Sequence, residues 1–419
     1  MKAIIIFLFL ISKAQAAIHL SWEECIQEIG QNNPDLRSAM NSLEASHYQL
    51  HGNYSGYLPQ ISGTISSSRG GASGSTPRNP SSSFSATFSA TQNLFTGLQT
   101  KAAIDQAKAT ERVSQANLQT VKATVSYSFK TAYMGLIYAQ SYLKLTEDII
   151  HRREENLRIV ELRFKNGKEN KGDLLLSEAY LKEARFNRLV AQDSMELARF
   201  QLAQVLGRED SSELQIDDNI PVTNPDSHFD LKQLAVQTAD HRQAAAQEDS
   251  ADAAVTVARG AFFPALNATG SVGPTGPTFL PSNNGGNTNV WSVGLSLTYA
   301  FFNGGKDYYS TKASVQTWKA AAATRESVDR GLLTKLKQAF HAFNEAVEKL
   351  KVDQTYLEAS TVRELIGRAK YNNGLLSFED WDIIENDLIT RQTTVLSSRQ
   401  NRVLAEAAWE QAQGKGVVP

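Results

Sequence analysis

The feature that most constrains the fold is an internal duplication, because the two halves of the chain align almost end to end. Residues 33–36 (NPDL) correspond to residues 238–241 (TADH), an offset of 205 positions (238 minus 33). The polar turn KNGKENKGD at 165–173 corresponds to NNGLLSFED at 372–380, an offset of 207 positions (372 minus 165). Each half therefore specifies the same series of structural elements.

The duplication also sets the predicted domain limits. A polar, acidic and proline-bearing stretch between the halves indicates a connection and not a core element. The predicted segments are a signal peptide at 1–16, a first structural repeat at 17–207, a connecting segment at 208–228, a second repeat at 229–414 and a C-terminal tail at 415–419. Within each repeat we expect a helix, two strands, a long helix, a tip turn and a returning helix.

The amino terminus has the form of a secretory signal peptide. It carries an early lysine, an apolar run at 3–11 and the small-residue site AQA at 14–16. This run is too short to span a bilayer, and no later stretch approaches the roughly 20 apolar residues of a transmembrane helix. The single cysteine, Cys25, has tryptophan three places before it and not the leucine of a lipid-attachment site, so we interpret it as a packed side chain.

Two long stretches without proline predict two helical hairpins, since proline breaks helix interiors. They cover residues 81–220 and 282–418. Apolar residues recur within them at spacings of three and four, from Leu118 to Leu143 and from Leu336 to Leu350, which is typical of a coiled coil. A helix unbroken from about residue 96 to residue 166 would extend over roughly 105 Å.

Four shorter segments alternate with a period of two, which predicts strands at about 57–68, 83–95, 262–273 and 289–302. One side of each is apolar or aromatic and the other carries small hydroxyl residues, as expected with lipid outside and water inside. A sandwich strand shows the same period, so this pattern leaves both architectures open. The residues assigned to the lipid side are Phe84, Phe88, Trp291, Val293, Leu295 and Leu297.

The loops favour an outer-membrane barrel over a sandwich, because residues 69–82 and 274–287 are long and rich in Gly, Ser, Pro and Asn. Four strands cannot close a barrel, and hydrocarbon does not tolerate open strand edges. Two copies would give eight strands and a filled interior, whereas three copies give twelve strands and a lumen. We therefore predict an α+β membrane protein that shares its barrel among the chains of a trimer.

The duplicated halves and several short motifs resemble the TolC family of outer-membrane efflux and secretion channels. The motifs are LSWEECIQEIGQNNPDL (20–36), the strand entries LP (58–59) and FP (263–264), the strand exits NLFTG (93–97) and FFNGG (301–305), and the paired Gly-x5-Asp turns. The resemblance covers residues 20 to 414.

The resemblance implies a homotrimeric barrel in the outer membrane of a Gram-negative bacterium, in contact with its lipid and continued by a coiled-coil helical tunnel across the periplasm. Such a duct is passive, closed at its inner tip, and docked to a periplasmic adaptor (membrane fusion) protein and an inner-membrane transporter. It would serve tripartite efflux or type I secretion. Drugs, metal ions and proteins leave through similar channels, so the cargo follows from the transporter.

The two polar turns would form the periplasmic tip, with Gly167 and Gly374 in the helix–helix turns. Asp173 and Asp380, six residues after each glycine, have two readings that can hold together. Each could stabilise the start of a returning helix through the helix dipole, worth about 0.3–1 kcal/mol. Each could also contribute to a ring of negative charge that narrows a pore and favours cations.

The resemblance implies specific roles at this tip. Asp380 matches a gate aspartate, Asp173 its partner in the first repeat, and Tyr371 a tyrosine that ties the helices shut. A basic residue and a second acidic residue of the family are replaced here by Leu376 and Ile383. The polar latch is therefore expected to be differently composed, with Asp382 and Glu385 as substitutes.

Other functional classes find less support. No His-Glu-x-x-His, P-loop, paired-cysteine or Gly-x-Ser-x-Gly motif is present, so we expect no enzyme, cofactor or metal site. The formal net charge of −2 gives no argument for a nucleic-acid partner. A periplasmic coiled-coil adaptor is the main alternative, but it needs neither the alternating strands nor a second copy of the unit. A secreted enzyme with an unrecognised motif is the other.

Overall fold

The computed structural model describes residues 18–72, 78–209, 214–217, 220–226, 229–278 and 286–418, and the predicted signal peptide at 1–16 lies outside them. The chain forms two compact units. We call them the sheet unit, Met40–Asn117 with Ala239–Gly331, and the hairpin unit, Met1–Ala39 with Leu118–Thr238 and Leu332–Pro419.

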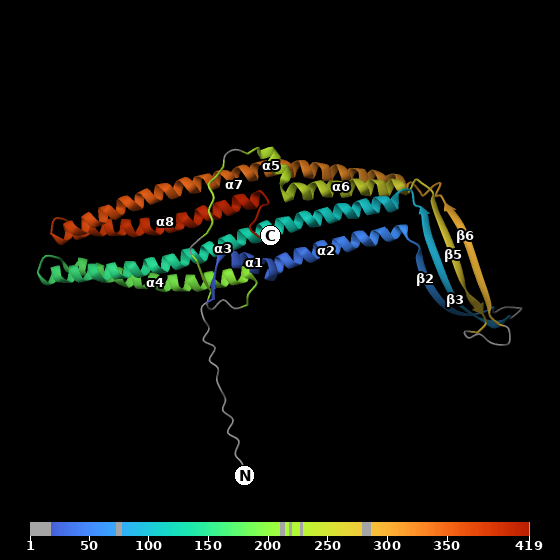
Figure 1. Ribbon diagram of the computed structural model, residues 1–419, viewed down its shortest axis with the longest axis horizontal. Coiled ribbons are helices and arrows are strands. Elements are labelled where there is room, and N and C mark those ends of the chain that lie inside the picture. Colours follow the sequence, from blue (N-terminus) through green and yellow to red (C-terminus); the bar gives the residue numbers. More distant parts are fainter. Residues whose placement is uncertain are drawn as a thin grey trace, which may run out of the picture. The chain divides into compact units, whose positions relative to one another are not determined.

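The sheet unit contains a four-stranded antiparallel sheet in the order β2-β3-β5-β6 (Figure 1). Its strands are β2 (Gln60–Ala72), β3 (Arg78–Phe95), β5 (Ala265–Gly276) and β6 (Thr288–Thr298). The four predicted strands are thus confirmed, but the loop expected at 69–82 is largely strand. It is shorter because the hydrogen-bonded ladder continues through its Ser-rich and Gly-rich flanks, and residues 73–77 lie outside the described range. Helices α2 (Pro34–Tyr54) and α6 (Ala239–Gly260) precede the two strand pairs, the first through a short 3-10 turn at Ser55–Tyr57.

The strand register separates the two kinds of side chain across the whole sheet. One row of directly paired residues is Gly63, Phe88, Val272 and Trp291, and the neighbouring row is Ser62, Ser89, Ser271 and Ser292. Neighbouring residues on a strand point to opposite faces, so one face is apolar and the other hydroxylated. The hydroxyl face is bonded across strands, with 2.7 Å between the Oγ atoms of Ser66 and Ser85 and 2.9 Å between those of Ser271 and Ser292. The apolar face is open, since Phe88 is 65% exposed and Trp291 is 75% exposed.

Two helical hairpins carry the rest of each repeat. Helix α3 (Gln99–Lys165) turns into α4 (Lys171–Leu206), and α7 (Lys306–Asn372) turns into α8 (Phe378–Ala412). Helices α3 and α7 have 67 residues each, which corresponds to about 100 Å. The prediction of one unbroken long helix in each half is confirmed.

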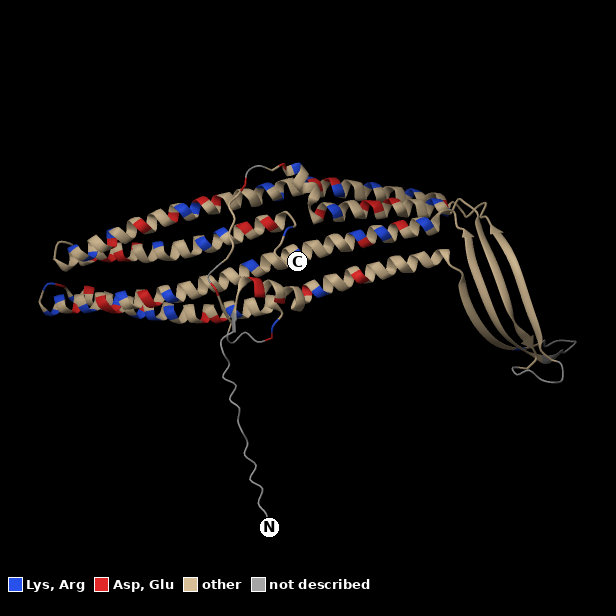
Figure 2. Cartoon of the chain, viewed as in Figure 1, with Lys and Arg blue, Asp and Glu red and all other residues tan. Residues whose placement is uncertain are grey.

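Charged side chains are distributed along the long helices (Figure 2). None of the described helices combines the length and the apolar character that a membrane crossing requires. By contrast, β5 and β6 contain no charged residue, while β2 and β3 contain only Arg69 and Arg78. The four strands are therefore nearly free of charge.

The main core of the hairpin unit forms around the first described residues, β1 (Ile18–Leu20) and α1. Helix α1 (Trp22–Asn32) begins with a capping box in which Ser21 and Glu24 satisfy each other's backbone. The Trp22 ring packs 4.6 Å from Phe129 and 5.1 Å from Tyr133, measured between ring centroids. Cys25 is fully buried, as interpreted from the sequence, and this burial raises the pKa of its thiol to about 12.

The prediction that the connecting segment is not a core element is wrong, because part of it packs into this core. Strand β1 (Ile18–Leu20) pairs in parallel with β4 (Leu214–Ile216), and both Leu214 and Ile216 are buried. A short helix, α5 (Leu231–Gln237), follows. The segment therefore anchors β1, at the start of the described chain, in addition to joining the repeats.

Candidate functional site: the tip of the helical hairpins

The two hairpin turns are built in the same way. Gly167 and Gly374 adopt φ values of 70° and 74°, a left-handed conformation that costs other residues roughly 1–2 kcal/mol. The amide after each glycine bonds back to the helix, from Lys168 to the carbonyl of Arg163 at 2.8 Å and from Leu375 to that of Lys370 at 2.9 Å. This pattern ends an α-helix within one turn. It explains why the short polar motif occurs once in each repeat.

Asp173 and Asp380 start the returning helices. The backbone amide of Asp173 donates to the side chain of Asn170 at 3.0 Å, and that of Asp380 donates to Ser377 at 3.1 Å. In return, each carboxylate accepts a hydrogen bond from the same capping side chain at 2.7 Å. These contacts support the first of the two predicted roles, in which both aspartates stabilise the start of a helix. Burial and neighbouring Glu169 raise the pKa of Asp173 above its usual value, against the hydrogen bond from Asn170.

Tyr371 joins the two hairpins. Its buried ring stacks on Trp381, with centroids 4.3 Å apart and planes 11° apart, and its hydroxyl donates to the Glu169 carboxylate at 2.8 Å. The Arg163 guanidinium lies 4.5 Å from the ring centroid and donates to the Tyr371 carbonyl at 2.9 Å. Arg163 also pairs with Glu169 at 3.1 Å. Burial, followed by the negative charge of Glu169, raises the pKa of the Tyr371 hydroxyl, so the hydroxyl stays protonated and keeps donating.

Asp382 makes a second link between the hairpins. Its carboxylate accepts a hydrogen bond from the Tyr180 hydroxyl of α4 at 2.8 Å and pairs with Arg153 of α3 at 3.5 Å. Arg153 also donates to Asn386 at 2.5 Å and lies 4.6 Å from the centroid of the Tyr180 ring. The position named from the sequence as a substitute acid therefore bonds to both helices of the other hairpin.

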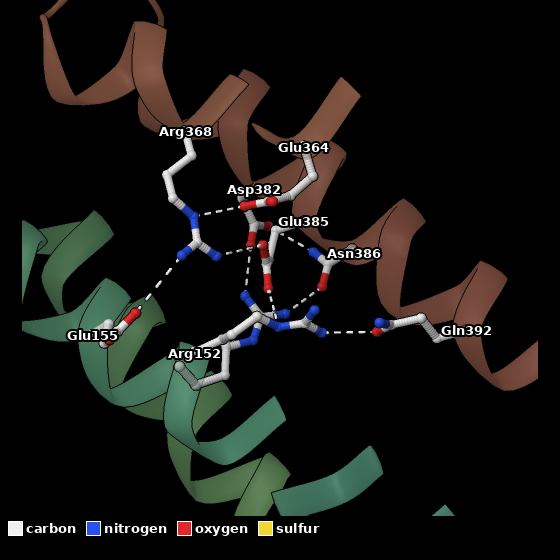
Figure 3. A network of polar contacts seen from close by, with 9 residues as sticks. Arg152, Glu155, Glu364, Arg368, Asp382, Glu385, Asn386 and Gln392 are labelled. Atoms are coloured by element: carbon white, nitrogen blue, oxygen red, sulfur yellow. Dashed lines mark hydrogen bonds and ion pairs between the residues drawn. The ribbon is translucent and has the colours of Figure 1, made fainter. Parts of the chain in front are cut away.

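Glu385 is the most buried charge of the tip, with 1% of its surface exposed. Figure 3 shows it between Arg152 of α3 and Arg368 of α7, whose nitrogens lie 3.3 Å and 3.8 Å from its oxygens. Neither carboxylate oxygen accepts a hydrogen bond from the described residues. Burial raises the pKa of Glu385 and the nearby Arg152 opposes this shift. Arg368 continues the network to Glu155 of α3 at 3.7 Å.

The two departures from the family pattern have structural counterparts. Leu376, where a base was expected, packs half-buried against the cluster of Val160, Tyr371 and Trp381. Ile383 is exposed. Sequence reasoning did not find Glu169, Arg163 or Trp381, and no local motif marks them. Tyr371, an aromatic residue three positions before the tip glycine Gly374, was the one available signal, because a large ring at a turn needs partners.

Comparison with known proteins identifies the architecture. Residues 25–208 and 231–415 match the outer membrane efflux protein family, one match for each repeat. The chain belongs to this family. Within the family it is 23% identical to the probable efflux pump outer membrane protein TtgC of Pseudomonas putida, over 94% of this chain and 83% of TtgC. It is 22% identical to the cation efflux system protein CusC of Escherichia coli K12, over 93% of this chain and 86% of CusC.

Solved structures of the same family share the fold. A structure of CusC superposes with a TM-score of 0.84, covering 94% of this chain and 92% of that chain at 19% identity. A structure of the outer-membrane channel OprN superposes with a TM-score of 0.83, covering 95% and 90% at 21% identity. The TolC-like fold predicted from the sequence is confirmed. As a member of the outer membrane efflux protein family, the chain is an outer-membrane efflux channel of Gram-negative bacteria and not an enzyme.

Proposed function

We propose that three copies of this chain form a closed twelve-stranded barrel, continued by a helical tunnel, as the passive exit duct of a tripartite efflux system. A periplasmic adaptor and an inner-membrane transporter would complete the system. The transporter would supply the energy and select the cargo. TtgC is a probable efflux pump component, which supports efflux over protein secretion.

The edges of the sheet carry the trimer proposal. Within the described sheet, β2 and β6 each pair on one side only. Both strands place exposed residues on the apolar face of the sheet, among them Ile61 of β2 and Leu297 of β6. Unpaired backbone groups cost several kcal/mol each in hydrocarbon, so β6 of one copy must pair with β2 of the next. Closure after three copies gives twelve strands and a lumen lined by the hydroxyl face.

The contacts between the hairpins support a closed resting tip. Tyr371 of α7 bonds to Glu169 in the turn between α3 and α4. Asp382 and Glu385 of α8 pair with Arg153 and Arg152 of α3. An opening that separates the hairpins would break all three contacts. Because Leu376 cannot form the expected ionic latch at the turn, these deeper contacts would hold the gate. Asp173 and Asp380 would add negative charge near the constriction, in addition to their helix-end role.

Lysine placed on either face of the sheet tests this proposal. Phe88→Lys or Leu295→Lys would put a charge on the lipid face, at a cost of about 2–4 kcal/mol per site near the bilayer centre. Thr87→Lys and Ser296→Lys are the matched controls, because each changes the residue adjacent to Phe88 or Leu295 on the same strand, which would face the lumen. We expect heat-resistant oligomers, with the mass of three chains, only from the controls and wild type.

Two results would contradict the proposal. Equal oligomer yield from all four lysine variants would remove the assignment of the faces. A native mass that corresponds to another number of chains would remove the trimer.

A further inference from the structure

We propose that His47 and His51 form a binding site for one divalent transition-metal ion, with Glu111 as the residue that orients His47. This inference is independent of the gate and of the number of copies. Both histidines lie on α2 and Glu111 lies on α3, and all three belong to the sheet unit. We expected no metal site from the sequence, yet His47 and His51 are four residues apart on one helix face.

The distance between the ring nitrogens fits a shared ion. The Nε2 atoms of His47 and His51 are 3.1 Å apart. Two imidazoles that bind one ion at about 2.0–2.1 Å, in adjacent positions of a tetrahedron or octahedron, hold their nitrogens about 2.9–3.4 Å apart. The observed pair lies within this interval, so the two nitrogens are already at the separation that a shared ion requires.

Glu111 sets the chemistry of the pair. Its Oε1 atom lies 2.8 Å from Nδ1 of His47, and its side chain is only 18% exposed. A carboxylate at Nδ1 favours the proton on that nitrogen and leaves Nε2 of His47 with a free lone pair. The contact between the two Nε2 atoms then requires His51 to donate a proton to His47. On metal binding the His51 proton would move through solvent from Nε2 to Nδ1, so that His51 stays neutral and both Nε2 atoms offer a lone pair to the ion.

The ligand set selects the class of metal. Neutral imidazole nitrogen suits Cu²⁺, Ni²⁺ and Zn²⁺, and among these Cu²⁺ binds a given nitrogen site most tightly. The described residues contain no group of three or more His, Cys, Asp and Glu side chains arranged for a metal. His47 is 48% exposed, so water would fill the remaining coordination positions. The site is therefore suited to reversible binding of exchangeable ions.

The test is a titration of the full-length chain, purified without a polyhistidine tag, with Cu²⁺ as the probe. Electron paramagnetic resonance with spin-echo modulation counts the imidazoles on the ion. We expect two in the wild type and one in His51→Gln, with at least about a 10-fold weaker affinity. Glu111→Gln keeps both ligands and should weaken binding by about 10- to 100-fold, as is typical of outer-shell partners.

The control variant is His151→Gln, which removes an exposed histidine that pairs with Glu155 at 3.5 Å and has no histidine neighbour four residues away. It should bind Cu²⁺ as the wild type does. Wild-type spectra that show a single imidazole, or a double variant His47→Gln/His51→Gln that binds with unchanged affinity, would overturn the proposal. Equal affinity of Glu111→Gln and wild type would overturn the role of Glu111.

Discussion

Removal of one hydroxyl group, in Tyr371→Phe, should loosen the closed tip. The hydroxyl is buried and donates to the Glu169 carboxylate at 2.8 Å, while the ring is held separately by Trp381. A hydrogen bond to a charged group contributes about 1.5–3 kcal/mol. If the bond exists only in the closed tip, its loss shifts the equilibrium toward the open form about 10- to 150-fold per chain.

Planar-bilayer recording measures this shift as the fraction of time spent at high conductance. Hydrogen exchange of the amides around Tyr371 reports the same opening by a second method. Glu169→Gln removes the charge from the same bond and from the Arg163 pair at 3.1 Å, so it should open the tip at least as much. The double variant should cost less than the sum of the single variants, since both remove one interaction.

Tyr356→Phe is the matched control, because Tyr356 lies on the same helix and is 53% exposed. Its ring contact with Arg391, at 4.7 Å, survives the change. We expect wild-type conductance and exchange from this control. The reasoning is refuted if Tyr371→Phe also gates as the wild type does while its tip amides exchange at unchanged rates.

Further substitutions probe the neighbouring parts of the tip. Alanine at both Asp173 and Asp380 should reduce cation selectivity and block by divalent ions in single-channel recordings; unchanged selectivity would leave them as helix-end residues only. Gly374→Ala should destabilise the turn by roughly 1–2 kcal/mol, seen as faster local exchange. Gly331→Ala, inside α7 where an added methyl group meets open space, should be neutral or stabilising. The folded state raises the pKa of Glu385, so the contribution of this group to stability is present below the usual glutamate pKa and is lost as the pH rises through the raised value. Glu385→Gln should therefore flatten this part of a pH series of unfolding midpoints. An unchanged slope would contradict the shift.

The sequence was sufficient for the architecture because its signals are periodic. Alternation with period two predicted the four strands, and apolar spacings of three and four predicted the long helices. Each spacing places the apolar residues on one face of only one kind of element. The tip glycines were also predictable, because a left-handed residue at a helix end is a local requirement. The ends of the strands were predicted less accurately. Much of the loop expected at 69–82 is strand, because serine and glycine do not prevent the backbone hydrogen bonds between β2 and β3 from continuing.

The contacts of the tip could not be predicted in the same way. Glu169 and Tyr371 are 202 positions apart, and neither belongs to a pattern that names the other. Arg153 and Asp382, at 229 positions, are likewise joined only by the packing of two hairpins. The strand β4 was missed because its three residues are too few to show a period. Contacts of this kind depend on helix rotation, which a sequence pattern defines only to within a face.

The latch between the hairpins, Glu169 with Tyr371, takes a different residue from each repeat, and the duplication makes this asymmetry visible. An offset of 207 places Glu169 opposite Leu376 and Tyr371 opposite Phe164, so each pole of the latch has an apolar counterpart in the other repeat. The glycine turns and helix caps, which serve each hairpin alone, remain alike in both repeats. The residues of this latch, which reach across to the other hairpin, differ between the repeats. Identical hairpins arranged around an axis would meet at identical interfaces. Because the latch residues differ, the interface from a first hairpin to the second differs from the interface from a second hairpin to the next first one. In the proposed trimer, six similar hairpins would then close as three latched pairs, one within each chain.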